Sequence, residues 1–227
     1  MIPFFNLAFG FIPIALVLVV MHRWSLDALG GLYASGRMLV QLLAVGYVLT
    51  YIFETENPLV ILAVIVVMIS VSAWIALRPL AKISVRSYLI TLIAIGVSGL
   101  AILVLVTQLI LDMPSWLAPR IVVPLAGMIF ANSMNTISLA AERFEAEMKK
   151  AARYTDARKI ALDAALIPQI NALLAVGLVS LPGMMTGQIL SGVSPLIAAR
   201  YQIMVMCMIF GAAGLSTIIY LKLRESR

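Results

Sequence analysis

Residues 57–77 read NPLVILAVIVVMISVSAWIAL and carry no charged side chain. A helix rises about 1.5 Å per residue, so about 20 residues cross the roughly 30 Å hydrocarbon core of a bilayer. The stretch therefore predicts a transmembrane helix. Together with similar windows it predicts about seven spans: Met1–Met21, Met38–Phe53, Asn57–Leu77, Ser87–Leu111, Ile121–Ala141, Ala164–Ala199 and Tyr201–Leu221.

The composition supports the same fold class. Hydrophobic residues make up 63% of the 227 residues and charged residues 11%, whereas a soluble domain is about half apolar and a quarter charged. We therefore expect an all-α integral membrane protein, with residues 1–227 forming one transmembrane domain. The net charge of +6 does not indicate nucleic-acid binding, because the basic residues lie in short runs between the apolar windows.

The basic residues also predict the topology. They gather in the first, third and fifth connections and at the C-terminus, while the other connections carry few. Since cytoplasmic loops are enriched in lysine and arginine, we expect the N-terminus outside, the C-terminus in the cytoplasm, and a multi-pass protein of the cell inner (plasma) membrane. The residues are Arg23; Arg78, Lys82 and Arg86; Arg143, Lys149, Lys150, Arg153, Arg158 and Lys159; and Lys222, Arg224 and Arg227.

Two windows have irregular lengths. Met38–Phe53 is short, so its span is predicted to start near Gly36, with Leu26–Ser35 lying along the membrane surface as an elbow. Ala164–Ala199 is too long for one span and contains Pro182–Gly183. There we expect one span that ends near this break, followed by an irregular segment at membrane depth that is packed against protein.

One connection is large enough to form cytoplasmic structure. Residues 142–163 are predicted to form a helix, a sharp turn at Arg153–Tyr154 and a second helix that continues into the sixth span. Glu145 and Lys149 are four residues apart, in the order that stabilises a helix surface. This connection is the expected contact for a cytoplasmic partner.

The sequence carries no recognisable catalytic motif. A phosphate loop of the form G-x-x-x-x-G-K-[ST] is absent, and the single His22 and Cys207 form no conventional metal or catalytic cluster. The acidic residues fall in connections or at membrane edges, whereas ion-coupled carriers need ionisable groups inside the membrane. We expect a non-enzymatic subunit that binds no cofactor, with the energy source outside the spans and the metal ligands, if any, unknown.

The fifth span offers polar side chains at membrane depth, in the stretch PLAGMIFANSMNTISLA. Asn132 and Asn135 are three residues apart, and Met128 lies one turn before Asn132, so the three share a helix face. Uncharged amides inside a membrane either line a path or hold helices together. The sequence leaves both interpretations open.

The end of the sixth window offers a second group. Pro182 and Gly183 would break the helix, and broken helices at membrane depth recur at substrate sites. Met184, Met185 and Gln188 follow in the run LPGMMTGQ. Thioethers favour soft metals such as Cu(I), but methionine also fills irregular gaps in apolar cores.

Three further polar residues are candidates for an interface or a gate. Arg37 and Gln41 are four residues apart near the start of the second span, and Arg200 lies on the outer side. Each arginine either extends its charge to the membrane surface or clamps a substrate.

Several stretches resemble the FetB-like family of ABC transporter permeases, which includes bacterial iron-export permeases and the membrane partner of a plant aluminium-tolerance transporter. The resemblance covers about residues 34–220, and the LPGMM run is its most specific part. The matching stretches are GRMLVQLLAVGYVLTYIF from Gly36, PLAGMIFANSMN from Pro124, AALIPQIN from Ala164, GLVSLPGMMTGQILSGVSP from Gly177 and RYQIMVM from Arg200.

The resemblance implies a half-transporter that forms a homodimer and works with a separate cytoplasmic ATPase, which binds ATP-Mg. It implies export of iron or a related metal, and plant relatives are linked to nucleotide-sugar movement. A carrier or channel that works without an ATPase is the main alternative, and a membrane scaffold is a third. Under the leading hypothesis, residues of the large connection contact the ATPase: Glu145, Lys149, Arg153, Tyr154 and Arg158.

Overall fold

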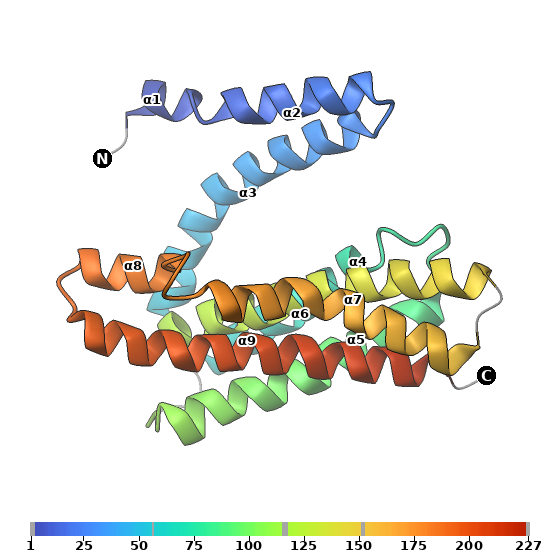
Figure 1. Ribbon diagram of the computed structural model, residues 1–227. Helices are drawn as coiled ribbons and strands as arrows, with labels where there is room; N and C mark the ends of the chain where they lie inside the picture. Colours follow the sequence, from blue (N-terminus) through green and yellow to red (C-terminus); the bar gives the residue numbers. More distant parts are fainter. Residues whose placement is uncertain (1–2, 56, 115–117, 151–152, 226–227) are drawn as a thin grey trace. The chain divides into compact units, whose positions relative to one another are not determined.

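The structure is a computed structural model, which describes residues 3–55, 57–114, 118–150 and 153–225. In these ranges the regular structure is helical (Figure 1), apart from one isolated bridge between Val176 and Ser180. The chain divides into two compact units, residues 1–55 and residues 56–227. The predicted all-helical class is confirmed.

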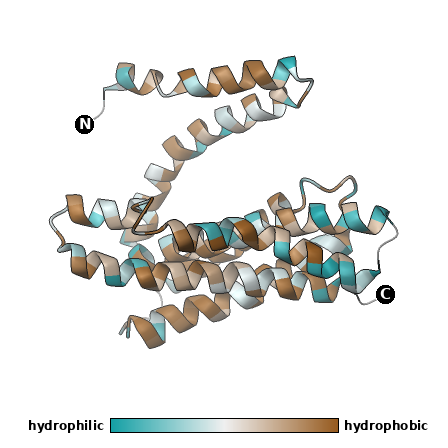
Figure 2. Ribbon diagram, in the orientation of Figure 1, coloured by the Kyte–Doolittle hydropathy of each residue, from teal (hydrophilic) through white to brown (hydrophobic). Residues whose placement is uncertain are grey.

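Six helices are long and apolar enough to cross a membrane, counted over the described residues. Six of the seven predicted windows each correspond to one of these helices, while the window Ala164–Ala199 shares only residues 195–199 with the last of them. Figure 2 shows that most of their residues are hydrophobic, with hydrophilic residues gathering toward the end of the second unit where the C-terminus lies. The six are Phe5–Arg23, Ala28–Glu54, Pro58–Ala76, Val85–Ile110, Pro119–Lys149 and Pro195–Leu223.

The first unit contains α1 (Phe4–Ala8), α2 (Phe11–Arg23) and α3 (Ala28–Glu54). Helix α2 packs against α3, and a Cβ added at Gly31 would lie 2.7 Å from a methyl group of Leu18. The two helices therefore approach closely where glycine leaves room.

The predicted surface elbow is not a separate element. The Asp27 side chain caps α3 by accepting the Gly30 N–H at 2.8 Å, and the helix then continues without interruption to Glu54. Helix propensity alone does not reveal this, because Gly30 and Gly31 read as breakers. The cap and the contact with α2 allow the helix to begin at Ala28 instead of near Gly36.

The second unit is built around α6. This helix packs against α4, α5, α7 and α9, and α9 in turn contacts α5, α7 and α8. A π-helical segment, η1, continues α5. The elements are α4 (Pro58–Ala76), α5 (Val85–Val104), η1 (Leu105–Ile110), α6 (Pro119–Lys149), α7 (Tyr154–Ala175), α8 (Gly183–Leu190) and α9 (Pro195–Leu223).

Small side chains allow this close packing. Ala126, Ala140 and Ala141 of α6, together with Ala161 of α7 and Ala212 of α9, have no exposed surface. Lipid is as apolar as leucine, so helices in a membrane associate through close van der Waals contact, and small residues permit it. The alanines thus bring four helices onto α6.

The sixth predicted window differs from the expectation. Helix α7 ends at Ala175, well before Pro182, because the Val179 and Ser180 N–H groups turn back to the Ala175 carbonyl at 2.8 and 3.1 Å. Gly177 permits this turn, since its φ of +83° is one that other residues rarely adopt. The segment predicted to be irregular is instead helix α8, with Pro182 at its N-cap.

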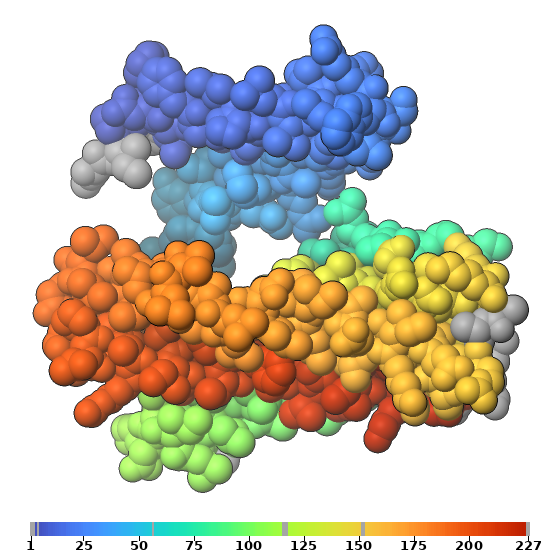
Figure 3. All heavy atoms as spheres, viewed as in Figure 1, coloured from blue at the N-terminus to red at the C-terminus, as the bar shows by residue number. Residues whose placement is uncertain are grey.

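Together α7 and α8 run beside α9 from one end to the other. At one end the Tyr154 hydroxyl, at the start of α7, donates to the Leu221 carbonyl. At the other end, Met184 and Gln188 of α8 share a pocket with Tyr201 of α9. Figure 3 shows the continuous band of α7 and α8 lying over α9 on this face. The broken segment therefore covers the length of a full span.

The contact between α5 and α6 predicts a sharp difference between two glycines of α5. A Cβ at Gly99 would lie 2.6 Å from the Phe130 ring, whereas one at Gly96 would meet a side chain only at 3.8 Å. We expect Gly99→Ala to destabilise the protein by about 1–3 kcal/mol through overpacking. The control Gly96→Ala should be neutral or stabilising by up to about 1 kcal/mol, because alanine favours helix. Thermal unfolding of both purified variants measures the difference, and equal melting temperatures would contradict it.

Candidate functional site

A pocket of about 590 Å³ lies between α6, α8, α9 and the end of α5–η1. We call it the methionine pocket, because four of its lining side chains are thioethers from four different segments. Its lining consists of Leu111, Met113, Arg120, Ile121, Pro124, Leu125, Met128, Met184, Gln188, Tyr201 and Met204. Three residues predicted for a substrate path, Met128, Met184 and Gln188, meet here.

Gln188 places a buried amide in the pocket lining. Its Oε1 atom is buried and has no donor among the described residues. Buried polar groups are normally paired with protein or water. The Gln188 oxygen therefore lacks the partner that a buried polar group normally has, which makes this residue the polar candidate of the pocket.

The charge of the methionine pocket comes from Arg120. It lies in the first turn of α6 and, among the described lining residues, is the one ionisable side chain besides the Tyr201 phenol. The thioethers are soft donors, whereas iron prefers oxygen and nitrogen ligands. Among the described residues, no group of three or more His, Cys, Asp or Glu side chains could hold a metal ion.

One turn along α6, a polar cluster joins α6 to α7. Gln169 of α7 donates to Asn132 Oδ1 at 3.3 Å and to Thr136 Oγ1 at 3.4 Å. The Asn132 amide also donates to the Met128 carbonyl at 2.8 Å. Asn132 therefore connects α6 to α7, which agrees with the interpretation that the amides hold helices together. Sequence reasoning missed Gln169, although its amide stands in an otherwise apolar stretch.

Other predicted path residues lie outside the pocket lining. Asn135 is exposed, and Met185 is half-buried. Pro182 and Gly183 form the start of α8. The pocket side chains that sequence reasoning missed include Arg120, in the first turn of α6, and Met204, in the third turn of α9. No local pattern marks them.

The gate candidates are placed as follows. Arg37 is half-buried and Gln41 exposed, both within α3. Arg200 is exposed in the second turn of α9, directly before Tyr201 of the methionine pocket. Their predicted roles stay predictions.

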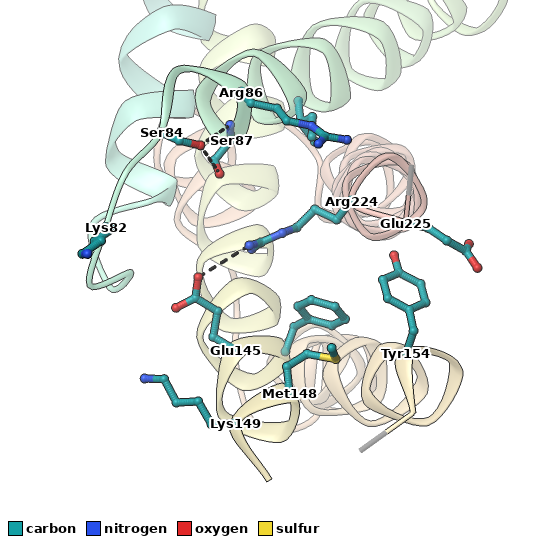
Figure 4. Close-up of a pocket in the computed structure, with 12 residues that line it drawn as sticks. Lys82, Ser84, Arg86, Ser87, Glu145, Met148, Lys149, Tyr154, Arg224 and Glu225 are labelled. Atoms are coloured by element: carbon teal, nitrogen blue, oxygen red, sulfur yellow. Dashed lines mark hydrogen bonds and ion pairs between the residues drawn. The ribbon is translucent and has the colours of Figure 1, made fainter. Parts of the chain in front are cut away.

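At the opposite end of the second unit, a second pocket of about 570 Å³ is lined by residues of four segments. We call it the basic pocket (Figure 4). It contains most of the predicted coupling residues, in a lining made of Lys82, Ser84, Arg86, Ser87, Ile90, Phe144, Glu145, Met148, Lys149, Tyr154, Arg224 and Glu225.

Tyr154 holds the helix ends together beside this pocket. Its hydroxyl donates to Leu221 of α9, and its ring meets Phe144 of α6 edge-to-face at 5.4 Å. Burial raises the pKa of Tyr154, and the Glu225 carboxylate raises it further, while Arg158 and Arg224 oppose this effect. The phenol therefore remains protonated and able to donate at neutral pH.

Ion pairs replace the predicted Glu145–Lys149 contact. Glu145 pairs with Arg224 at 3.5 Å, because α9 ends beside α6. The i,i+4 pair on this part of α6 joins Arg143 to Glu147 at 3.0 Å instead. The predicted pairing is therefore wrong, since the sequence does not show which helix end lies opposite Glu145.

The remaining two coupling candidates lie on α7. Arg153 is the N-cap residue and pairs with Asp156 at 2.9 Å, with 83% of its side chain exposed. Arg158 pairs with Glu225 at 3.2 Å and lies over the Tyr154 ring at 5.8 Å. Arg153 therefore remains accessible, while Arg158 helps to hold α7 on the C-terminal end of the chain.

Comparison with known proteins places this arrangement in a family. Residues 4–227 match the model of the uncharacterised protein family UPF0014. The chain belongs to the UPF0014 family. A UPF0014 membrane protein of Synechocystis is 36% identical over 82% of this chain and 78% of its own length.

Two further relatives carry functional names. The probable iron export permease protein FetB of Escherichia coli is 32% identical, with 97% of this chain and 90% of that protein aligned. The protein ALUMINUM SENSITIVE 3 of Arabidopsis thaliana is 28% identical, with 93% and 82% aligned. The resemblance drawn from the sequence motifs is thereby confirmed. No solved structure gives a significant match to this UPF0014 chain.

The α6–α7 cluster leads to a prediction that separates its two possible roles. We expect Gln169→Leu to lower stability by about 0.5–1 kcal/mol, the usual value of a hydrogen bond between membrane helices. Asn135→Leu is the matched control on the exposed face of α6 and should leave the melting temperature unchanged. Thermal unfolding in lipid nanodiscs measures both. A Gln169→Leu variant as stable as the unaltered protein would favour a path over a helix contact.

Proposed function

We propose that the chain is the membrane-spanning permease subunit of an ABC transporter and exports iron or a related metal. The observation that carries this proposal is its similarity to the E. coli protein named probable iron export permease over 97% of this chain. Two copies of the chain would form a homodimer in the cell inner (plasma) membrane. A separate cytoplasmic ATPase would bind ATP-Mg, while this chain would catalyse no reaction and bind no cofactor.

The distribution of charge supports an external energy source. The sequence holds no phosphate loop, and the acidic residues of α6 lie in its last turns, beside the basic pocket. A carrier driven by protons or ions would need ionisable groups within the membrane. Conformational energy would instead enter through the helix ends that surround the basic pocket.

The proposed contact with the ATPase is the α6–α7 hairpin. Lys149, at the end of α6, and Arg153, at the N-cap of α7, are exposed. Tyr154 and Arg158 fasten the start of α7 to the C-terminal end of α9. A push on the exposed residues would therefore be passed to α7 and α9, and α9 runs on to the methionine pocket.

The proposed topology has seven crossings, with the N-terminus outside and the C-terminus cytoplasmic. Helices α7 and α8 together would form the seventh crossing, which is broken and therefore escapes a criterion of length and hydropathy. The α8 end of this segment shares a pocket with Met204 of α9, and the α7 end contacts Leu221 of α9. At about 1.5 Å per residue, these two positions lie about 25 Å apart along the helix. That separation approaches the thickness of a hydrocarbon core.

Labelling of single cysteines tests the broken crossing. In a Cys207→Ala background, Ser191→Cys after α8 should react with an impermeant maleimide in intact cells. Lys159→Cys near the start of α7 should react only after the membrane is opened. Both positions are exposed, so access depends on the side of the membrane. Labelling of both from the same side would show that α7–α8 does not cross.

A second candidate, a permease for an organic anion such as a nucleotide sugar, is favoured by one observation. Among the residues that the structure describes, Arg120 and no acidic side chain line the methionine pocket. Such a lining suits a negatively charged substrate better than a bare metal cation. The transport assay below therefore includes both substrate classes.

The transport prediction uses inverted membrane vesicles that contain the chain and its ATPase. We expect ferrous iron to accumulate only with ATP, and not when the phosphate-loop lysine of the ATPase is replaced. Gln188→Leu should reduce accumulation about tenfold if its amide contacts the substrate, since one hydrogen bond lost at a buried site costs about 1–3 kcal/mol. Leu190→Ala, at an exposed site on the same helix, is the control.

Three outcomes would change the proposal. Iron movement without ATP in vesicles that contain only this chain would indicate a carrier or channel. ATP-driven uptake of a nucleotide sugar but not of iron would select the second candidate. Absence of any transport with a correctly assembled complex would point to a scaffold.

A further inference from the structure

The basic pocket carries an excess of positive charge. Four cationic and two acidic side chains line it. Both acids already have partners, since Glu145 pairs with Arg224 and Glu225 with Arg158. No salt bridge within the described ranges reaches Lys82 or Lys149. Their ammonium groups are therefore available to an anion.

The pocket also contains hydrogen-bond donors suited to phosphate. Helix α5 begins here, with Ser84 as its N-cap and Ser87 in its first turn. The Ser84 hydroxyl accepts the Ser87 N–H at 3.1 Å and is hydrogen-bonded to the Ser87 hydroxyl at 2.9 Å, so this pair retains one hydroxyl proton for an anion. The helix dipole also favours negative charge at this end. Figure 4 shows both serine hydroxyls beside Arg86, with Lys82 and Lys149 at the edges of the pocket.

An apolar stripe leaves this pocket along α5. Val85, Leu89, Ile93 and Val97 are spaced one turn apart, and each side chain is about half exposed or more, at 76%, 50%, 47% and 58%. They lie beside Ser87 and Ile90 of the pocket, on the neighbouring face of the helix. A ligand with a charged head and a hydrocarbon tail could occupy both surfaces at once.

We propose that the basic pocket binds the phosphate headgroup of an anionic phospholipid, with one acyl chain along the α5 stripe. Basic pockets between membrane helices bind lipid phosphates through the same chemistry. The adjoining stripe favours a lipid over a soluble phosphate or an acidic protein segment, because neither of these has a tail to cover it. The bound lipid would bridge the starts of α5 and α7 and the end of α6, where movement is proposed to enter.

Native mass spectrometry of the delipidated, purified protein tests this site. The probes are dioleoyl phosphatidylglycerol, zwitterionic dioleoyl phosphatidylcholine and soluble glycerol phosphate. The test variant is Lys82→Gln with Lys149→Gln, and the control is Lys159→Gln with Lys222→Gln. All four lysines are exposed, and the control pair lies outside the pocket while removing the same charge.

We expect phosphatidylglycerol to bind the unaltered protein and the control more tightly than phosphatidylcholine. The Lys82/Lys149 variant should lose about tenfold or more in affinity for phosphatidylglycerol, because each lysine near a lipid phosphate contributes about 1 kcal/mol. Leu89→Asn should also weaken lipid binding, through the acyl chain.

Two results would overturn the proposal. Equal affinity of the test and control variants for phosphatidylglycerol would show that the pocket does not hold the headgroup. If the Lys82/Lys149 variant keeps its affinity for phosphatidylglycerol but no longer associates with the ATPase, the pocket is a docking surface for the ATPase and not a lipid site. Glycerol phosphate binding as tightly as the lipid would assign the pocket to a soluble phosphate.

Discussion

The close approach of helices to α6 is the constraint on which the second unit depends. In a bilayer, apolar surface gains little by leaving lipid, so contact between helices must come from fit. Alanines without exposed surface line α6 and its neighbours, and Gly99 of α5 lies against Phe130 with no room for a methyl group. A larger side chain at any of these positions would move a helix and, with it, one wall of a pocket.

The two ends of this bundle differ in chemistry. At one end, Arg224 lies over the Phe144 ring at 5.4 Å and donates to the Tyr220 hydroxyl at 2.8 Å, so the ends of α6 and α9 are joined by charge and aromatic contact. At the other, thioethers and aliphatic side chains surround Arg120 and the unpaired oxygen of Gln188. A rigid, charged end and an adaptable, methionine-lined end suit a protein that receives force at one side and holds a substrate at the other.

Sequence patterns predicted the spans better than they predicted the site. Windows without charge mark α4 and α9 because a charged side chain is costly in hydrocarbon and is therefore rare within a span. Met128, Met184 and Gln188 were grouped by reasoning on polar and soft groups, and the structure brings them into one pocket. Arg120 and Gln169 were missed, because their roles depend on helices that are distant in the chain. The prediction that Glu145 pairs with Lys149 is wrong for the same reason, since the partner of Glu145 is Arg224 at the end of α9.

What the sequence determined by itself is the solvent and the secondary structure: apolar windows of span length require a bilayer, and a bilayer requires helices whose backbone groups are paired internally. Tertiary structure alone decided where the sixth window breaks. Proline at position 182 suggested the break, but α7 ends at Ala175 because Gly177 turns the backbone. It also decided that α8 lies beside the start of α9, since packing between distant segments is not encoded in any local pattern of residues.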